Sequence, residues 1–293
     1  AEASRPEFIV ALKYLYTVPR VRAKNASSRR AVVAIPKKSL GQHWLHDPDI
    51  LAYIADAAQL TPNDTVLEIG PGLGTLTSRL LARAGRVVAV EFDTDLARKL
   101  PGQFPGKNLE VVNQDILRFD PSKLPHGYKI VANVPYYITS KIIQTFSECN
   151  NPPSMMVLLV QKEVAERLAA SPGKYSILAI AAQVFHQVDT GVVVPAALFT
   201  PPPKVDSQVV ILKRYREPVV PHDLQPVFLR LVKAGFSAKR KKLRSSLAGG
   251  LQLDKSYAEQ LLSRAHISSD ARAEELSIAQ WLDLARLYAK KSE

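Results

Sequence analysis

Val66-Leu67-Glu68-Ile69-Gly70-Pro71-Gly72-Leu73-Gly74 is an apolar strand that runs into a glycine-rich turn. Glycines allow such a turn to bend sharply and to approach a ligand closely. On both sides of this stretch, short apolar runs alternate with segments whose apolar residues recur at helical spacing. This alternation predicts the α/β class, with a mostly parallel sheet covered on both faces. The expected strands span residues 65–69, 86–90, 109–112, 129–132 and 155–160, and the expected helices span residues 73–82, 94–100, 140–146 and 162–170.

The chain divides at the two ends of this pattern. Residues 1–36 are basic and lack a sustained periodicity, which predicts a flexible extension. The pattern begins with a helix at Asp47-Pro48, an N-cap residue followed by a first-turn proline. We expect a Rossmann-like sheet domain over residues 37–216 and a smaller all-helical domain over residues 217–293, divided near a group of prolines. Late antiparallel edge strands are expected over 192–194 and 208–212, and C-terminal helices over 224–234, 239–247, 256–263 and 278–289.

The composition favours a polyanionic partner. The chain has 39 Lys and Arg against 27 Asp and Glu, a formal net charge of +12. A surplus of this size favours nucleic acid or anionic lipid. No apolar run approaches the roughly 20 residues of a membrane span. The single cysteine, Cys149, cannot form an intramolecular disulfide, and the six histidines lack metal-ligand spacing, so neither a membrane nor a metal is expected.

The glycine-rich turn alone leaves three interpretations open: a dinucleotide site, a site for the amino-acid part of S-adenosylmethionine, or structural packing. Three acids favour the methyl donor. Glu68 precedes Gly70 and can accept a hydrogen bond from a ligand ammonium or order the turn. Glu91 ends the next strand, where a carboxylate usually binds a ribose diol. Asp115 follows the third strand, where it can accept from an adenine amine. The predicted cofactor is S-adenosylmethionine, held by these acids and by the turn around Gly70 and Gly72.

Asn133-Val134-Pro135-Tyr136 is the most informative motif, and it follows an expected strand. The exocyclic amine of adenine is a poor nucleophile, because its lone pair is delocalised into the ring. Two acceptors can overcome this by accepting hydrogen bonds from the two N–H groups of the amine, which aims its lone pair at a methyl group. One acceptor is the Asn133 side-chain oxygen, and the other is a backbone carbonyl held by Pro135. Tyr136 offers a flat face on which the base can stack. Catalysis would then consist of positioning and electrostatics and would need no strong base. The alternative interpretation of the motif is a plain turn without a catalytic role.

In this order, the motifs resemble the KsgA family of small-subunit ribosomal RNA adenine dimethyltransferases, over about residues 37–289. The resemblance implies S-adenosylmethionine-dependent N6,N6-dimethylation of two adjacent adenines in the 3′-terminal hairpin of small-subunit (16S-type) rRNA, coupled to assembly of that subunit. The matching segments are residues 37–45, 68–74, 133–136, 161–164, 199–207 and 240–247.

The resemblance also implies roles for single residues. His43 and Leu45 would line the donor site, and Phe199 would pack against the flipped base from the side opposite Tyr136. The methionine part, the ribose and the adenine of the donor would be held by Gly70, Glu91 and Asp115.

Three positions depart from the family's pattern. His43 stands where Asn is usual, Tyr137 where Asn is frequent after the catalytic tyrosine, and Ser176 where Gly is usual. None of these departures removes Asn133 or Tyr136.

A cluster of cations follows the division between the expected domains, at the start of the helix expected over 239–247. We predict that these side chains contact phosphates, in which case binding depends on salt; a solvated helix face is the alternative. An adenine within a duplex has to be flipped out or already unpaired before an enzyme reaches it. The expected partner is therefore small-subunit rRNA in an immature small subunit, gripped by the helical domain through Lys239, Arg240, Lys241, Lys242 and Arg244.

Other functions stay open. An Erm-type enzyme acting on 23S rRNA would share the turn and the Asn-x-Pro-Tyr motif. A ribosome-assembly factor or mitochondrial transcription factor of the same fold would need no catalysis, although the intact acids and Asn133 weigh against it. A nicotinamide-dependent oxidoreductase has no use for an amine-orienting motif. We expect a cytoplasmic monomer, or a mitochondrial protein if the basic extension is a targeting segment.

Overall fold

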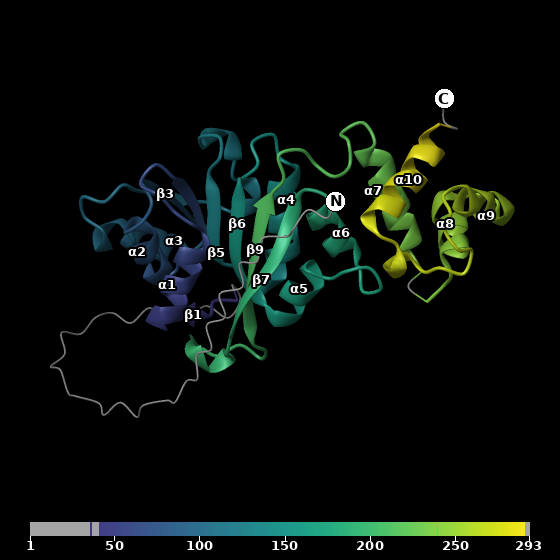
Figure 1. The fold of residues 1–293 in the computed structure, drawn as a ribbon. Helices are drawn as coiled ribbons and strands as arrows, with labels where there is room; N and C mark the ends of the chain where they lie inside the picture. The colour runs from purple at the N-terminus through teal and green to yellow at the C-terminus, as the bar shows by residue number, and fades with distance from the viewer. Residues whose placement is uncertain (1–35, 37–40, 239, 291–293) are drawn as a thin grey trace, which may run out of the picture. The chain divides into compact units, whose positions relative to one another are not determined.

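A computed structural model describes residue 36, residues 41–238 and residues 240–290 (Figure 1). The expected extension lies outside the described residues except for Pro36, and Lys239 lies outside them too. Within the described part of the chain, none of the helices has the length and apolar character needed to span a membrane.

The centre of the fold is a seven-stranded sheet made of β2 (Thr65–Ile69), β3 (Arg86–Glu91), β4 (Leu109–Asn113), β5 (Lys129–Asn133), β6 (Met155–Gln161), β7 (His186–Val194) and β9 (Ser207–Arg214). Their order is β4-β3-β2-β5-β6-β9-β7. The first five strands in that order are parallel, whereas β9 pairs antiparallel with both β6 and β7. This confirms the predicted α/β sheet with late antiparallel strands, although β7 begins earlier than predicted. Only its end residues, His186 and Val194, are buried, and the positions between them are partly or fully exposed, as expected of an edge strand.

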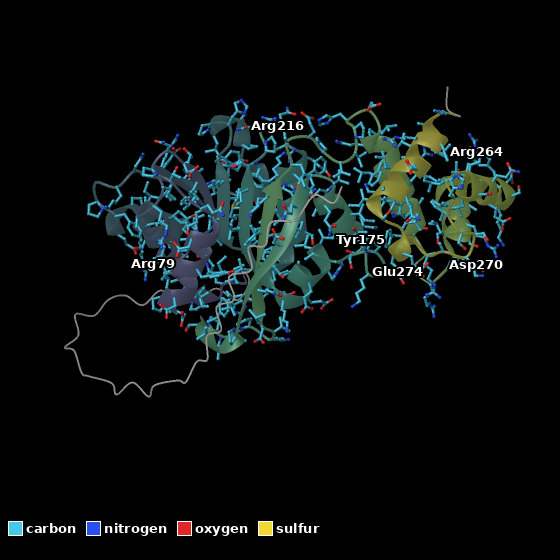
Figure 2. All side chains as sticks on the ribbon, in the orientation of Figure 1. Arg79, Tyr175, Arg216, Arg264, Asp270 and Glu274 are labelled. Atoms are coloured by element: carbon cyan, nitrogen blue, oxygen red, sulfur yellow. The ribbon has the colours of Figure 1, made fainter. Side chains whose placement is uncertain are left out.

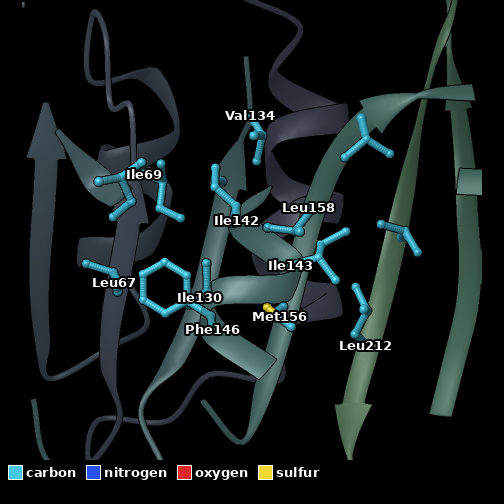
Figure 3. Packing of buried hydrophobic residues seen from close by; sticks show 14 of the residues in the cluster. Leu67, Ile69, Ile130, Val134, Ile142, Ile143, Phe146, Met156, Leu158 and Leu212 are labelled. Atoms are coloured by element: carbon cyan, nitrogen blue, oxygen red, sulfur yellow. The ribbon is translucent and has the colours of Figure 1, made fainter. Parts of the chain in front are cut away.

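Helices cover both faces of the sheet: α1 (Pro48–Ala57), α2 (Thr75–Leu81), α3 (Thr94–Lys99), α4 (Thr139–Glu148), α5 (Lys162–Leu168) and α6 (Ile177–Gln183). Successive strand residues point to opposite faces. Val66 packs with α1 and α2, while Leu67 packs with α4 and α5. Figure 3 shows the hydrophobic core on the α4 and α5 side of the sheet, where Ile142 and Phe146 of α4 lie against the strands. Burial on both faces explains why the parallel strands are apolar throughout.

Two helices differ from the sequence prediction in this part of the chain. The helix α2 begins at Thr75 rather than at residue 73, because Gly74 has a φ of 80° and cannot belong to a right-handed helix. The helix α6 was not predicted, since its sequence is apolar on most sides and gives little periodicity. Ser176, one of the departures from the family pattern, caps α6: its Oγ accepts the Ala179 N–H at 3.2 Å.

The C-terminal region is helical, as predicted, with α7 (Gln225–Gly235), α8 (Leu243–Leu251), α9 (Lys255–Arg264) and α10 (Ile278–Ala289). It has its own core, which also includes Ile180 and Val184 of the α6 segment. The predicted division at residues 216 and 217 therefore stays a prediction.

The helix α8 begins at Leu243, four residues later than predicted. Lys242 is extended (φ −62°, ψ 147°), and the Leu243 N–H donates to the Ala271 carbonyl at 2.8 Å. This hydrogen bond to a distant loop sets the start of the helix. The helix then continues through Gly250, where a Cβ atom would lie 2.8 Å from Ala234 of α7. As a result, Arg240 and Lys241 precede the helix rather than belonging to it.

Candidate functional site

A cavity of about 280 Å³ opens at the carboxyl ends of the parallel strands. It lies where the sheet order reverses between β2 and β5, the usual ligand crevice of an open α/β sheet. The short strand β1 (Trp44–Leu45), which pairs with β8 (Phe199–Thr200), forms another wall. Of the residues predicted for the donor and the base, the cavity brings together His43, Leu45, Glu68, Gly70, Gly72, Glu91, Asp115, Asn133, Pro135 and Tyr136.

The glycine-rich turn forms the floor of the cavity and is held from two sides. Gly72 has a φ of 57°, and a Cβ atom there would lie 3.2 Å from Nε1 of Trp44. From the other side, the Gly72 N–H donates to Oε2 of Glu91 at 3.0 Å. The left-handed backbone conformation favours glycine at this position, and the close contact with the indole leaves little room for a side chain.

Glu91 links the turn to the end of β3. Its Oε1 accepts the Asp93 N–H at 2.8 Å, while its Oε2 holds the turn at Gly72. Burial raises the pKa of this carboxyl, and the backbone N–H donors oppose that shift. Each carboxylate oxygen has a second lone pair, so the group can hold the turn and still accept from a ligand hydroxyl.

Asp115 caps the short 3-10 turn Ile116–Arg118, where its Oδ1 accepts the Leu117 N–H at 2.9 Å. The cap fixes the carboxylate at the rim of the cavity, so that its Oδ2 can serve a ligand amine.

Glu68 lies fully buried beneath the turn. Its pKa is raised to about 8, mainly by burial; the Thr77 hydroxyl opposes this shift and the nearby Glu91 carboxylate adds to it. Its Oε2 has no hydrogen-bond partner among the described residues. In the donor-free protein, Glu68 is therefore mostly protonated at neutral pH and can donate a hydrogen bond, whereas a nearby ligand cation would favour the ionised form.

Glu68→Gln should change how stability depends on pH in the donor-free protein. Because the folded pKa of Glu68 lies above its unfolded value, the wild type should lose stability between about pH 4.5 and 8, by roughly 1 kcal/mol per pH unit. Gln does not titrate and should remove this slope. Urea unfolding from pH 5 to 9 measures it, with the exposed Glu217→Gln as control. If the free energy of unfolding depends on pH in the same way in the wild type and in Glu68→Gln, the raised pKa of Glu68 is refuted.

Asn133 ends β5, and its amide is oriented by a backbone contact. Nδ2 donates to the His43 carbonyl at 3.0 Å. Since a carbonyl can only accept, the NH2 group has to face His43, which leaves Oδ1 as the acceptor on the other side. The amide therefore presents an oxygen at the cavity wall, as its predicted role requires.

The backbone after Asn133 offers a second acceptor. The Val134 N–H donates to the Leu159 carbonyl at 3.2 Å, and the following Pro135 restricts the conformation of Val134. The Pro135 carbonyl already accepts the Ile138 N–H at 3.2 Å. The sequence motif did not specify which backbone carbonyl Pro135 holds in place. We therefore assign this role to the carbonyl of Val134.

Tyr136 is fixed at both its hydroxyl and its ring. The hydroxyl lies 2.7 Å from Oγ of Ser207, and the ring stacks on His43 with a centroid distance of 5.9 Å. His43 Nδ1 donates to the Pro201 carbonyl at 2.7 Å. Burial raises the pKa of Tyr136, so the phenol is neutral. His43 thus helps to hold both Asn133 and Tyr136.

Phe199 is not brought into the cavity. It is 3% exposed, pairs with Leu45 between β8 and β1, and packs in the core beside α1 and α2. Among the lining residues that received no site role in the sequence analysis, three are aromatic: Trp44, Phe92 and Tyr137. Phe92 is 61% exposed directly after Glu91, and an aromatic residue following a strand-end acid is the signal that could have identified it.

The predicted cation cluster is partly neutralised. Lys242 Nζ lies 2.6 Å from Asp270, and Arg244 lies 3.0 Å from Glu259. Arg240 and Lys241 are exposed and have no ion pair among the described residues. These two side chains are therefore the available cations of the described cluster.

Comparisons with known proteins extend over most of the chain. A family model described as ribosomal RNA adenine dimethylase matches residues 35–290. The ribosomal RNA small subunit methyltransferase A of Dehalococcoides mccartyi is 40% identical over 258 residues, covering 87% of this chain and 89% of the relative. A dimethyladenosine transferase from Plasmodium falciparum superposes with a TM-score of 0.74 at 28% identity, covering 85% of this chain and 98% of that one. The 23S rRNA methyltransferase ErmE superposes with a TM-score of 0.69 at 31% identity, covering 83% of this chain and 98% of that one.

Proposed function

The chain belongs to the ribosomal RNA adenine dimethylase family, and on that premise we propose that it dimethylates the N6 amines of two adjacent adenines in the 3′-terminal hairpin of small-subunit rRNA. The observation that carries this proposal is the pair of acceptors at the end of β5. The Asn133 amide is oriented by His43. The Val134 carbonyl is held by the following Pro135 and by the hydrogen bond that the Val134 N–H donates to Leu159 of β6.

The cavity residues fit S-adenosylmethionine as the methyl donor. Asp115 and Glu91 present acceptors at the ends of neighbouring strands, suited to the adenine amine and the ribose hydroxyls. Glu68 has an unsatisfied buried oxygen beneath the glycine-rich turn, suited to the amino-acid end. The spatial order of the three acids along the sheet edge thus matches the order of the polar groups along the donor.

In the transfer, this chain's residues act by position. S-adenosylmethionine, when bound, supplies a methyl group on a sulfonium. In the first transfer, Asn133 Oδ1 and the Val134 carbonyl accept hydrogen bonds from the two N–H groups of the target adenine, which turns the nitrogen lone pair out of the ring plane. In the second transfer, one of these acceptors binds the remaining N–H group. Tyr136 holds the base by stacking, and its fixed hydroxyl keeps the ring in place. The methylated amine releases its proton to water without a strong base, so the rate enhancement comes from orientation and fixed dipoles.

The substrate is the small rather than the large ribosomal subunit in this proposal. Support comes from the relative named for the small subunit, which is 40% identical, against 31% for the 23S rRNA methyltransferase ErmE. The test offers undermethylated small and large subunits separately, with labelled S-adenosylmethionine. Label on the small subunit supports the proposal; label confined to the large subunit would favour the Erm-type alternative, and none on either would refute catalysis.

We further propose that Arg240 and Lys241 bind phosphates of an immature small subunit. Neutralising both with Gln should lower the slope of log binding constant against log salt by roughly 0.7–0.9 for each phosphate that is no longer neutralised. Lys242→Gln should have a smaller effect, since Lys242 is already paired with Asp270. Filter binding at several salt concentrations measures the slopes, with exposed Lys107→Gln as control. An unchanged slope in the double variant would exclude this segment from the interface.

A further inference from the structure

A second cavity, of about 1000 Å³, lies between α4, the segment Gly173–Leu178, and α7. The Glu274 carbonyl accepts the Gly173 N–H at 2.8 Å and so joins this segment to the C-terminal region. Figure 2 labels Tyr175 and Glu274 at this junction. Among the described residues, Tyr137 alone lines both this cavity and the one that holds Asn133. A strand of RNA with one base in the first cavity would therefore pass Tyr137 on its way into the second.

Tyr137 is a large aromatic side chain that the fold leaves in solvent. It is 69% exposed, the highest exposure among the large hydrophobic residues of the described chain. It lies in the same 3-10 turn as Tyr136 and follows it directly. Its ring also lies against the turn at Gly41, where a Cβ atom would be 3.7 Å from Cδ1 and Cε1. The ring is thus supported on one side by backbone, although it contributes little to the core.

The walls of the second cavity carry cations that suit a nucleic-acid backbone. Lys141, Arg167, Lys174 and Lys233 line it, are exposed, and form no ion pair with other described residues. Three acids line it as well, and one of them, Glu148, accepts a hydrogen bond from Gln144. Cations beside an exposed aromatic ring are the usual components of a site for unpaired nucleotides.

Resting on the proposed function, we propose that Tyr137 stacks on the base next to the target adenine while that adenine occupies the catalytic cavity. Flipping the target removes a stacking neighbour from the adjacent base. The Tyr137 ring replaces that neighbour, and the second cavity receives the backbone that follows. Because the two targets are adjacent, the base on Tyr137 is the other adenine, held beside the cavity for the next round. Tyr137 is thus a positioning residue for RNA and does not touch the reacting atoms.

The test uses the full-length protein and reconstituted small subunits. One set carries both adenines, and a second set has an abasic site in place of one of them. Tyr137→Leu keeps the bulk of the side chain without its aromatic face, and Tyr137→Phe keeps the face. On particles with both adenines, Leu should raise KM about tenfold with little change in kcat, whereas Phe should match the wild type. On abasic particles, the wild type and Tyr137→Leu should have the same KM.

Two further measurements separate stacking from a structural effect. The donor Kd by calorimetry should be equal in all variants, and Tyr215→Ala, an exposed tyrosine that lines neither cavity, should leave KM unchanged. An equal rise in KM on intact and abasic particles, or no rise on either, would overturn the role of Tyr137. Absence of transfer by the wild type on intact particles would instead overturn the proposed function, so the two failures are distinguishable.

Discussion

Asn133→Ala should lower the single-turnover rate of methyl transfer by about 10²–10³-fold while leaving the affinities for donor and RNA nearly unchanged. The reason is that Oδ1 of Asn133 orients the amine only as the lone pair turns toward the methyl group, and removing an acceptor of this kind costs about that factor. Rapid quench with labelled donor measures the rate at saturating donor and particle.

The matched control is Asn108→Ala. Its amide also donates to a backbone carbonyl, that of Gly85 at 2.6 Å, but the residue does not line the cavity. Asn108→Ala should therefore transfer methyl groups at the wild-type rate. If Asn133→Ala also keeps that rate, or loses activity only through a higher donor Kd, the amide does not act on the amine.

Glu91→Gln should raise the donor Kd by about 100-fold. The carboxylate uses both oxygens, toward the N–H groups of Gly72 and Asp93, and each still has a lone pair for a ligand hydroxyl. Gln offers one oxygen, so its NH2 group would face a backbone N–H and the turn would lose one of its two attachments. Hydrogen bonds to a charged acceptor contribute about 1.5–3 kcal/mol each, so the loss of one such bond to the donor is consistent with this factor.

Calorimetry with S-adenosylmethionine measures the affinity, and hydrogen exchange at the Gly72 amide reports on the turn independently of activity. Glu110→Gln is the control, because Glu110 lies on the neighbouring strand β4, pairs with Arg86 and does not line the cavity. Wild-type affinity and exchange in Glu91→Gln would show that the carboxylate has neither role.

The sheet and its catalytic edge were predictable because the signals are local. Buried parallel strands are continuous apolar runs, and Glu68, Glu91 and Asn133 stand at or near their carboxyl ends, where parallel strands place side chains at one edge. Their placement around one cavity could therefore be predicted without knowing any contact between distant parts of the chain.

The remaining features depend on contacts between distant residues. Trp44 covers Gly72, and His43 orients Asn133, because β1 lies over the sheet edge; neither contact has a signal in the spacing of the sequence. The start of α8 is set by the hydrogen bond from Leu243 to Ala271, which no local propensity reveals. Phe199 was placed at the base through family resemblance, whereas the pairing of β8 with β1 buries it.

The most direct test of the central claim is the chemical identity of the product. Small subunits lacking these methyl groups are incubated with the purified protein and S-adenosylmethionine, and the RNA is digested and mapped by mass spectrometry. The account predicts N6,N6-dimethyladenosine at two adjacent positions of the 3′-terminal hairpin, formed far more slowly with Asn133→Ala. Methylation at another base or another atom, or unmodified adenines at both positions, would contradict it.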